Sequence, residues 1–133
     1  MNILFVTQYF YPENFRINDF SIELQKKGHD ITVLTAIPNY PNGKIYSGYG
    51  YFSLKEEIYN NIKIFRSPII PRGNSSNFML ALNYISFVIG GLLRALFLLN
   101  KKYDLIFIFQ ASPITSALPA IFLKKIKDLI TMP

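Results

Sequence analysis

The chain contains no cysteine and no tryptophan, and it has a single histidine. The absence of cysteine excludes disulfide bonds, cysteine-ligated zinc sites and thiol catalysis. One histidine is too few for a histidine-based metal centre, and a Ser-His-Asp triad would depend on it alone. His29 follows a predicted helix end, so we interpret it as part of a connector. We therefore expect no metal site and no cofactor held by these residues.

Charge is also scarce, since only 17% of the 133 residues are Asp, Glu, Lys or Arg while 50% are hydrophobic. This composition excludes a disordered chain and indicates one domain with a buried core. The net charge is +6, which suits nucleic acid or an anionic membrane surface. The lysines lie in small groups at the ends of apolar segments, not in one basic arm. We therefore favour a membrane surface and expect no nucleic acid partner.

The pattern of apolar residues predicts an α/β fold. Residues 2–7 form an apolar run typical of a strand buried on both faces, rather than a signal peptide. Residues 17–24 have helical spacing and end at Gly28, and residues 31–35 are β-branched. Further elements are expected at residues 53–59 and 62–66, which flank Asn60-Asn61 as a hairpin, and at 103–109 and 114–127. The order predicts a Rossmann-like, doubly wound, mostly parallel sheet with an inserted β-hairpin.

Residues 78–99 are apolar on all sides, apart from a few residues such as Asn83, Gly90-Gly91 and Arg94. Their length approaches the ~20 residues that cross a bilayer. One interpretation is a transmembrane helix. The other is one long helix, or two broken at the glycines, that packs on the sheet and dips into a membrane surface. We favour the second, because a spanning helix would separate the two halves of one sheet. The residues expected to face the membrane are Phe78, Leu82, Phe87, Arg94, Lys101 and Lys102.

Ligands of open parallel sheets bind beyond the carboxyl ends of the strands, where the strand order switches. Three segments are expected to meet there: residues 8–16, 38–50 and 110–115. Their aromatic, amide and hydroxyl groups suit a sugar or another polyol. The candidate residues are Tyr9, Tyr11, Glu13, Arg16, Asn39, Tyr40, Ser112 and Thr115.

The first turn between strand and helix contains no glycine, so it lacks the dinucleotide-binding pattern, and a Walker A loop is absent too. Glu13 is the sharpest candidate for chemistry, with Arg16 one turn away. The alternative is that Glu13 is an acid near a helix N-terminus with Arg16 as its local partner. The sequence leaves both interpretations open and identifies no catalytic residue.

Three stretches together resemble a known family: YFYPENFR at residues 9–16, KGHDITVLT at 27–35, and PNYPNGKIY at 38–46. They are similar to the N-terminal half of family 4 glycosyltransferases, in particular the WbuB-like fucosamine transferases of bacterial O-antigen, lipopolysaccharide and capsule polysaccharide synthesis. The stretch from Ala111-Ser112-Pro113 to Pro119-Ala120 is similar as well. The double glycine that many members carry after the first strand is replaced here by Tyr11-Pro12-Glu13, as in that subgroup.

The resemblance implies a metal-independent, retaining GT-B enzyme built from two Rossmann-like domains. In that family the N-terminal domain holds the acceptor, here a polyprenyl-diphosphate-linked sugar at the cytoplasmic, inner face of the plasma membrane. The resemblance adds Pro12 and Pro113 to the acceptor cleft. The nucleotide-sugar donor would bind a C-terminal domain that these residues do not contain.

We therefore expect residues 1–133 to be a truncated acceptor-side GT-B domain that is inactive alone and that a separate C-terminal half could complete. Another strand is expected to begin at 131–133. The alternatives are a non-catalytic, membrane-associated fragment and a small membrane protein that uses residues 78–99 as a span.

Overall fold

The computed structural model describes residues 1–50, 56–109, 118–127 and 130–132. They form a mixed α/β fold around one six-stranded sheet in the order β3-β4-β2-β1-β5-β6. Every neighbouring pair is parallel except β3 and β4. The strands are β1 (Asn2–Thr7), β2 (Asp30–Ala36), β3 (Glu57–Tyr59), β4 (Ile62–Ser67), β5 (Leu105–Phe109) and β6 (Ile130–Met132). The helices are α1 (Arg16–Lys26), α2 (Asn77–Ala95), the short η1 (Leu96–Leu98) and α3 (Leu118–Lys127).

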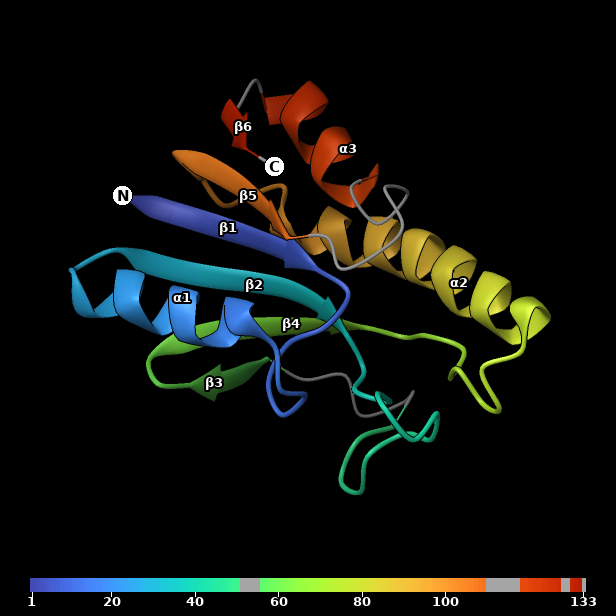
Figure 1. Ribbon diagram of the computed structural model, residues 1–133. Helices are drawn as coiled ribbons and strands as arrows, with labels where there is room; N and C mark the ends of the chain where they lie inside the picture. The colour runs from blue at the N-terminus through green and yellow to red at the C-terminus, as the bar shows by residue number, and fades with distance from the viewer. Residues whose placement is uncertain (51–55, 110–117, 128–129, 133) are drawn as a thin grey trace.

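Helices cover both faces of the sheet, with α1 on one face and α2 and α3 on the other (Figure 1). Successive side chains of β1 point to opposite faces of the sheet, as the pleat of a strand requires. Ile3 and Phe5 pack in the cluster under α1, whereas Leu4 and Val6 pack under α2 and α3. The predicted run of apolar residues in β1 is therefore explained by a strand buried on both sides.

The switch in strand order falls at β1, which lies between β2 and β5. The chain leaves β1 through α1 to β2 on one side. It later returns from β4 through α2 to β5 on the other side. In open parallel sheets, ligands bind beyond the carboxyl ends of the strands at such a switch.

The hairpin predicted around Asn60-Asn61 is confirmed, and both residues have left-handed backbone, with φ of 49° and 63°. Two such residues match the turn that joins tightly twisted antiparallel strands. The structure corrects one detail. β4 is no insertion, because it pairs in parallel with β2 from Thr32 against Lys63 to Ala36 against Ser67. Only β3 departs from the parallel sheet.

Helix α2 runs without interruption through Gly90 and Gly91, so the helix is not broken there. The glycines let the helix approach its neighbours: a Cβ on Gly90 would lie 2.5 Å from the Pro68 carbonyl oxygen. Together with η1, the segment Asn77–Leu98 is long and apolar enough to cross a membrane by length and composition, which alone is weak evidence for a span. In this fold it is the crossover helix between two parallel strands of one sheet.

The predicted membrane-facing residues divide into three groups. Phe78 and Lys102 are exposed, while Leu82 and Lys101 are partly buried. The prediction for Phe87 is wrong, because this ring is 0% exposed and packs with Ile37 and Ile69 under the loops. Arg94 is partly buried and donates from Nε to the Arg66 carbonyl oxygen at 3.0 Å, so it points along the protein surface.

Candidate functional site

Three loops meet at the carboxyl-end edge of the sheet, and we call residues 8–15, 37–50 and 68–76 the loop cluster. Glu13 joins the first loop to the second. Its Oε2 accepts a hydrogen bond from the Tyr40 amide at 2.8 Å and another from the Asn39 amide at 3.2 Å. A carboxylate is suited to this position, because it can accept both N–H groups with one oxygen. The Glu13 side chain thus holds the loop after β2 against the loop after β1.

Burial raises the pKa of Glu13 to about 7, although the two amides and the Arg66 guanidinium oppose the shift. The residue is 1% exposed, and its Oε1 has no hydrogen-bond partner among the described residues. A proton taken up by Glu13 is therefore best placed on Oε1. A buried carboxyl with a pKa near neutrality is a group that proton-transfer sites use.

Aromatic rings form the wall of the loop cluster beside Glu13. Tyr9 stacks on Phe15 with ring centroids 4.9 Å apart, and Tyr40 packs against both rings at 5.6 and 5.2 Å. Tyr9 is buried, and its burial raises the pKa of its hydroxyl to about 12. The phenol therefore stays protonated at neutral pH. Tyr40 is 36% exposed, so part of its ring is open to solvent, and sugar rings and apolar chains pack on such rings.

Arg72 brings a positive charge from the third loop to these rings. Its Nη1 donates to the Tyr9 hydroxyl at 2.8 Å, and its guanidinium carbon lies 5.1 Å from the Tyr40 ring centroid. Its backbone N–H donates to the Asn39 Oδ1 at 3.1 Å. Arg72 makes no ion pair with a described residue, and its buried Nε lacks a hydrogen-bond partner there. An arginine held between aromatic rings without a carboxylate is suited to an anionic group of a ligand.

The second and third loops also touch through their backbones. The Gly73 amide donates to the Gly43 carbonyl oxygen at 3.0 Å. Gly43 has φ +73°, and a Cβ on it would lie 2.0 Å from the Gly73 carbonyl oxygen. No side chain fits at this contact, which explains why a glycine follows Asn42 in the loop.

Two amides connect the loop cluster to α2. The Gln8 Nε2 donates to the Asn83 Oδ1 at 2.7 Å, and the Asn83 Nδ2 donates to the Ile70 carbonyl oxygen at 2.7 Å. Both amide side chains are buried. Gln8 Oε1 and Ser67 Oγ have no hydrogen-bond partner among the described residues, as is also true of Glu13 Oε1 and Arg72 Nε. Buried polar atoms are normally satisfied by protein, water or ligand, so this edge has spare hydrogen-bonding capacity.

A second network fixes the base of the first loop. Arg66 is 3% exposed and donates from Nη1 to the Ala36 carbonyl oxygen at 3.0 Å and from Nη2 to the Tyr11 carbonyl oxygen. It also pairs with Glu57 at 2.8 Å. The Tyr11 ring stacks on Tyr59 with centroids 3.7 Å apart. These contacts turn the Tyr11 side chain toward β3, away from Tyr9 and Tyr40.

The structure brings together two of the three segments predicted to meet, residues 8–16 and 38–50, while 110–115 lie outside the described residues. The predicted side chains of these two segments differ in burial. Tyr9, Glu13 and Asn39 are at most 4% exposed and hold the loops together, so they are not surface contacts for a ligand. Tyr40 and Arg16 are exposed, and Tyr11 and Pro12 are partly exposed. Ser112, Pro113 and Thr115 lie outside the described residues.

Four residues with a clear place at the site escaped the sequence analysis: Gln8, Arg66, Arg72 and Asn83. Arg72 lies in a segment rich in proline and glycine. This composition predicts a loop, but it does not predict that the loop lies beside the residues that follow β1. Asn83 carried the stronger signal, because a lone amide inside an apolar helix needs a buried partner.

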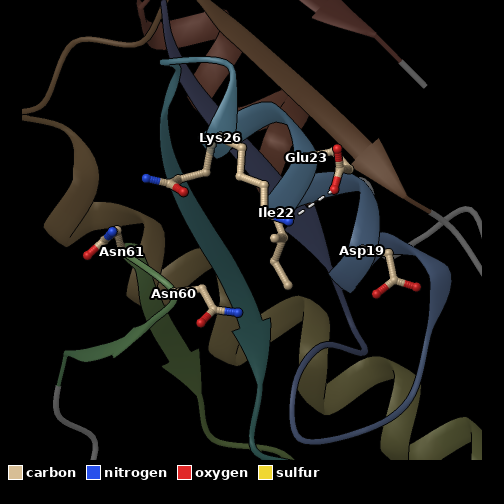
Figure 2. Close-up of a pocket in the computed structure, with 7 residues that line it drawn as sticks. Asp19, Ile22, Glu23, Lys26, Asn60 and Asn61 are labelled. Carbon is tan, nitrogen blue, oxygen red and sulfur yellow. Dashed lines mark hydrogen bonds and ion pairs between the residues drawn. The ribbon is translucent and has the colours of Figure 1, made fainter.

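A groove of about 560 Å³ lies between α1 and the β3–β4 turn, away from the loop cluster. Its lining includes Asp19, Glu23 and Lys26 of α1 and the turn residues Asn60 and Asn61 (Figure 2). The Lys26–Glu23 ion pair on its rim measures 3.4 Å and both side chains are exposed. The groove contains no buried acid or base comparable to Glu13. Within the described residues, no group of three or more His, Asp or Glu could hold a metal ion.

Comparison with known proteins adds to the fold and not to the site. No protein-family profile matches the chain, and no curated protein matches it. Two crystal structures of the C-terminal domain of a hydrogenase from Pyrococcus furiosus, residues 78–226 and 83–215, are similar in fold. Their TM-scores are 0.60 and 0.59 at 16% identity, over 98% of this chain and 88% of each domain. At this identity the likeness shows a shared α/β fold alone.

Proposed function

We propose that this chain is the acceptor-side domain of a retaining, GT-B glycosyltransferase with a Rossmann-like sheet. The enzyme would move a sugar from a nucleotide-sugar to a lipid-linked glycan acceptor during O-antigen or capsule polysaccharide synthesis. The observation that carries the proposal is the position of the loop cluster. A polar and aromatic site with an unpaired arginine lies at the carboxyl edge of the sheet, where the loop 68–76 leads directly into the apolar helix α2.

The chemistry of the loop cluster suits the head of such an acceptor. The exposed ring of Tyr40 can pack on a sugar face. Arg72 can pair with a phosphate of a polyprenyl diphosphate. Glu13 and Asn39 are buried and hold the loops that carry these two side chains in place.

Helix α2 supports a membrane location for the site. Its side away from the sheet exposes large apolar residues, and we call these residues, with two of η1, the outer face of α2. They are Phe78, Ile85, Ile89, Leu93, Leu96 and Phe97, each at least 49% exposed. An exposed apolar face of this extent marks an interaction surface, and a lipid surface suits a helix whose exposed residues are so rich in Ile, Leu and Phe. We propose peripheral attachment to the cytoplasmic face of the plasma membrane.

The first experiment is a binding measurement by NMR with a short-chain isoprenyl-diphosphate-linked monosaccharide. We expect amide shifts in residues 8–15, 37–50 and 68–76, and weaker binding for Arg72→Gln. The matched control is Lys27→Gln, which removes one positive charge from an exposed lysine at the end of α1, outside the loop cluster. Shifts confined to other parts of the chain would contradict the proposed site.

The second experiment measures sugar transfer from labelled nucleotide-sugars to a membrane extract. The chain is assayed alone and together with a donor-binding C-terminal domain. Transfer only in the second case supports the acceptor-side assignment. Transfer by the chain alone would contradict it, and absence of transfer in both cases with folded proteins favours a non-catalytic, membrane-associated protein.

A further inference from the structure

A cavity of about 340 Å³ opens at the opposite edge of the sheet from the loop cluster, and we call it the lysine pocket. Three lysines line it: Lys63 from β4, and Lys101 and Lys102 from the turn after η1. Asp30 contributes the one carboxylate in its lining. None of the three lysines forms an ion pair with a described residue. The pocket therefore has an excess of uncompensated positive charge.

The register of the sheet places the lysine pocket on the same face as α2. Leu4, Thr32 and Lys63 stand side by side on β1, β2 and β4, and Leu4 packs with Leu98 of η1. Neighbours in register point to the same side of a sheet. Lys63 and Thr32 thus lie beneath the end of the α2–η1 segment. The Lys101 ammonium is held over the Phe65 ring, 4.4 Å from its centroid.

A buried hydroxyl gives the pocket a second polar group. Tyr103 lines the pocket and is 5% exposed. Its hydroxyl lies near Thr32, but it makes no hydrogen bond with correct geometry to a described residue. A neutral phenol can donate to an anion, and lysine ammonium groups donate and neutralise it. This combination of donors suits the oxygens of a phosphate group.

The neighbours of the pocket indicate the source of that phosphate. Leu96 and Phe97, 49% and 67% exposed, belong to the outer face of α2 and precede Lys101 by only a few residues. Cations at the end of an apolar helix face lie at the depth of lipid headgroups when the face enters the acyl boundary. We propose that the lysine pocket binds the phosphate of an anionic phospholipid headgroup while the outer face of α2 enters the bilayer surface. This rests on the membrane attachment proposed above.

The test is flotation with vesicles of phosphatidylcholine, with and without phosphatidylglycerol. We expect Lys63→Gln and Lys102→Gln each to weaken binding to the anionic vesicles by roughly five-fold. Lys27→Gln is the matched control, because it removes the same charge from an exposed lysine at the end of α1, and we expect a change below roughly two-fold. Tyr103→Phe keeps the net charge and should weaken binding by roughly two- to five-fold through its lost donor. Circular dichroism of each variant confirms that it is folded.

If Lys27→Gln and Lys63→Gln weakened vesicle binding equally and Tyr103→Phe did not weaken it, the lysine pocket would be overturned. Membrane attachment would then depend on the net charge of the protein. Binding to neither vesicle would overturn both the pocket and the attachment. The NMR measurement with the soluble acceptor tests the loop cluster independently of both. A titration with inorganic phosphate completes the design: if free phosphate saturates the amides around Tyr103 and binding to the anionic vesicles is unchanged, the ligand is a soluble phosphate and the lipid proposal fails.

Discussion

The Glu13 carboxylate accepts a hydrogen bond from the Tyr40 amide at 2.8 Å, although the two residues are 27 positions apart in the chain. This contact and its companion at Asn39 close the loop after β2 onto the loop after β1. A group buried in this way links the shape of the candidate site to the protonation of one side chain.

Glu13 makes the stability of the protein depend on pH. Its pKa is about 7 in the folded protein against 4.5 for the ordinary group, so the folded state binds the proton more tightly. The stabilisation is complete below about pH 4.5 and is lost as the pH rises through 7. We expect the free energy of unfolding to fall by up to about 3 kcal/mol between pH 5 and pH 8.

Glu13→Gln is the control for that prediction, because its amide oxygen still accepts the two backbone N–H groups and does not titrate. Urea denaturation at a series of pH values measures both proteins. A flatter profile for Glu13→Gln is expected, and parallel profiles would show that another group is responsible.

Gly43→Ala should destabilise the protein by more than about 2 kcal/mol. Its backbone is left-handed, and the new Cβ would meet the Gly73 carbonyl oxygen at 2.0 Å. Gly48→Ala is matched in backbone, with φ +89° and nothing within 4 Å of the new Cβ. It should cost only about 1 to 2 kcal/mol of left-handed strain. Thermal denaturation compares the two, and equal melting temperatures would mean that the loops separate readily at Gly73.

Asn83→Leu should destabilise the fold even though it makes α2 more apolar. The substitution leaves the Gln8 Nε2 and the Ile70 carbonyl oxygen without their partner in a buried place, at a cost of about 2 to 4 kcal/mol. Ala81→Leu adds an apolar side chain at an exposed position of the same helix, and we expect almost no change. If Asn83→Leu were as stable as the original chain in urea, the amide network would not support the loops.

The ion pair of Arg66 and the ion pair of Lys26 should differ sharply in their contributions to stability. Arg66→Met removes the donor from two backbone carbonyl groups and from Glu57, and we expect a loss of at least about 2 kcal/mol. Lys26→Met breaks the exposed pair with Glu23, whose side chains are 65% and 64% exposed, and should change stability by no more than about 0.5 kcal/mol. Chemical denaturation of both variants measures the two changes in the free energy of unfolding. A small effect at Arg66 would show that water replaces its contacts.

Local patterns in the sequence determined the secondary structure and much of the topology. The apolar run of β1, the spacing of α1 with Gly28 after it, and the Asn60-Asn61 turn all depend on near neighbours in the chain. Sequence reasoning could therefore find these elements, and with them the loops after β1 and β2. It could also identify the long apolar helix, because composition alone marks it.

Only the tertiary structure decided which side chains of those loops are buried and what they contact. Glu13 is an anchor and not an exposed acid, because two amides of a distant loop lie within hydrogen-bond reach of it. Phe87 and Phe78 lie in the same helix and have the same chemistry, yet one is buried and the other is 71% exposed. Arg72 meets Tyr9 only because β4 pairs beside β2. Such contacts depend on register between segments far apart in the chain, and no local pattern contains that register.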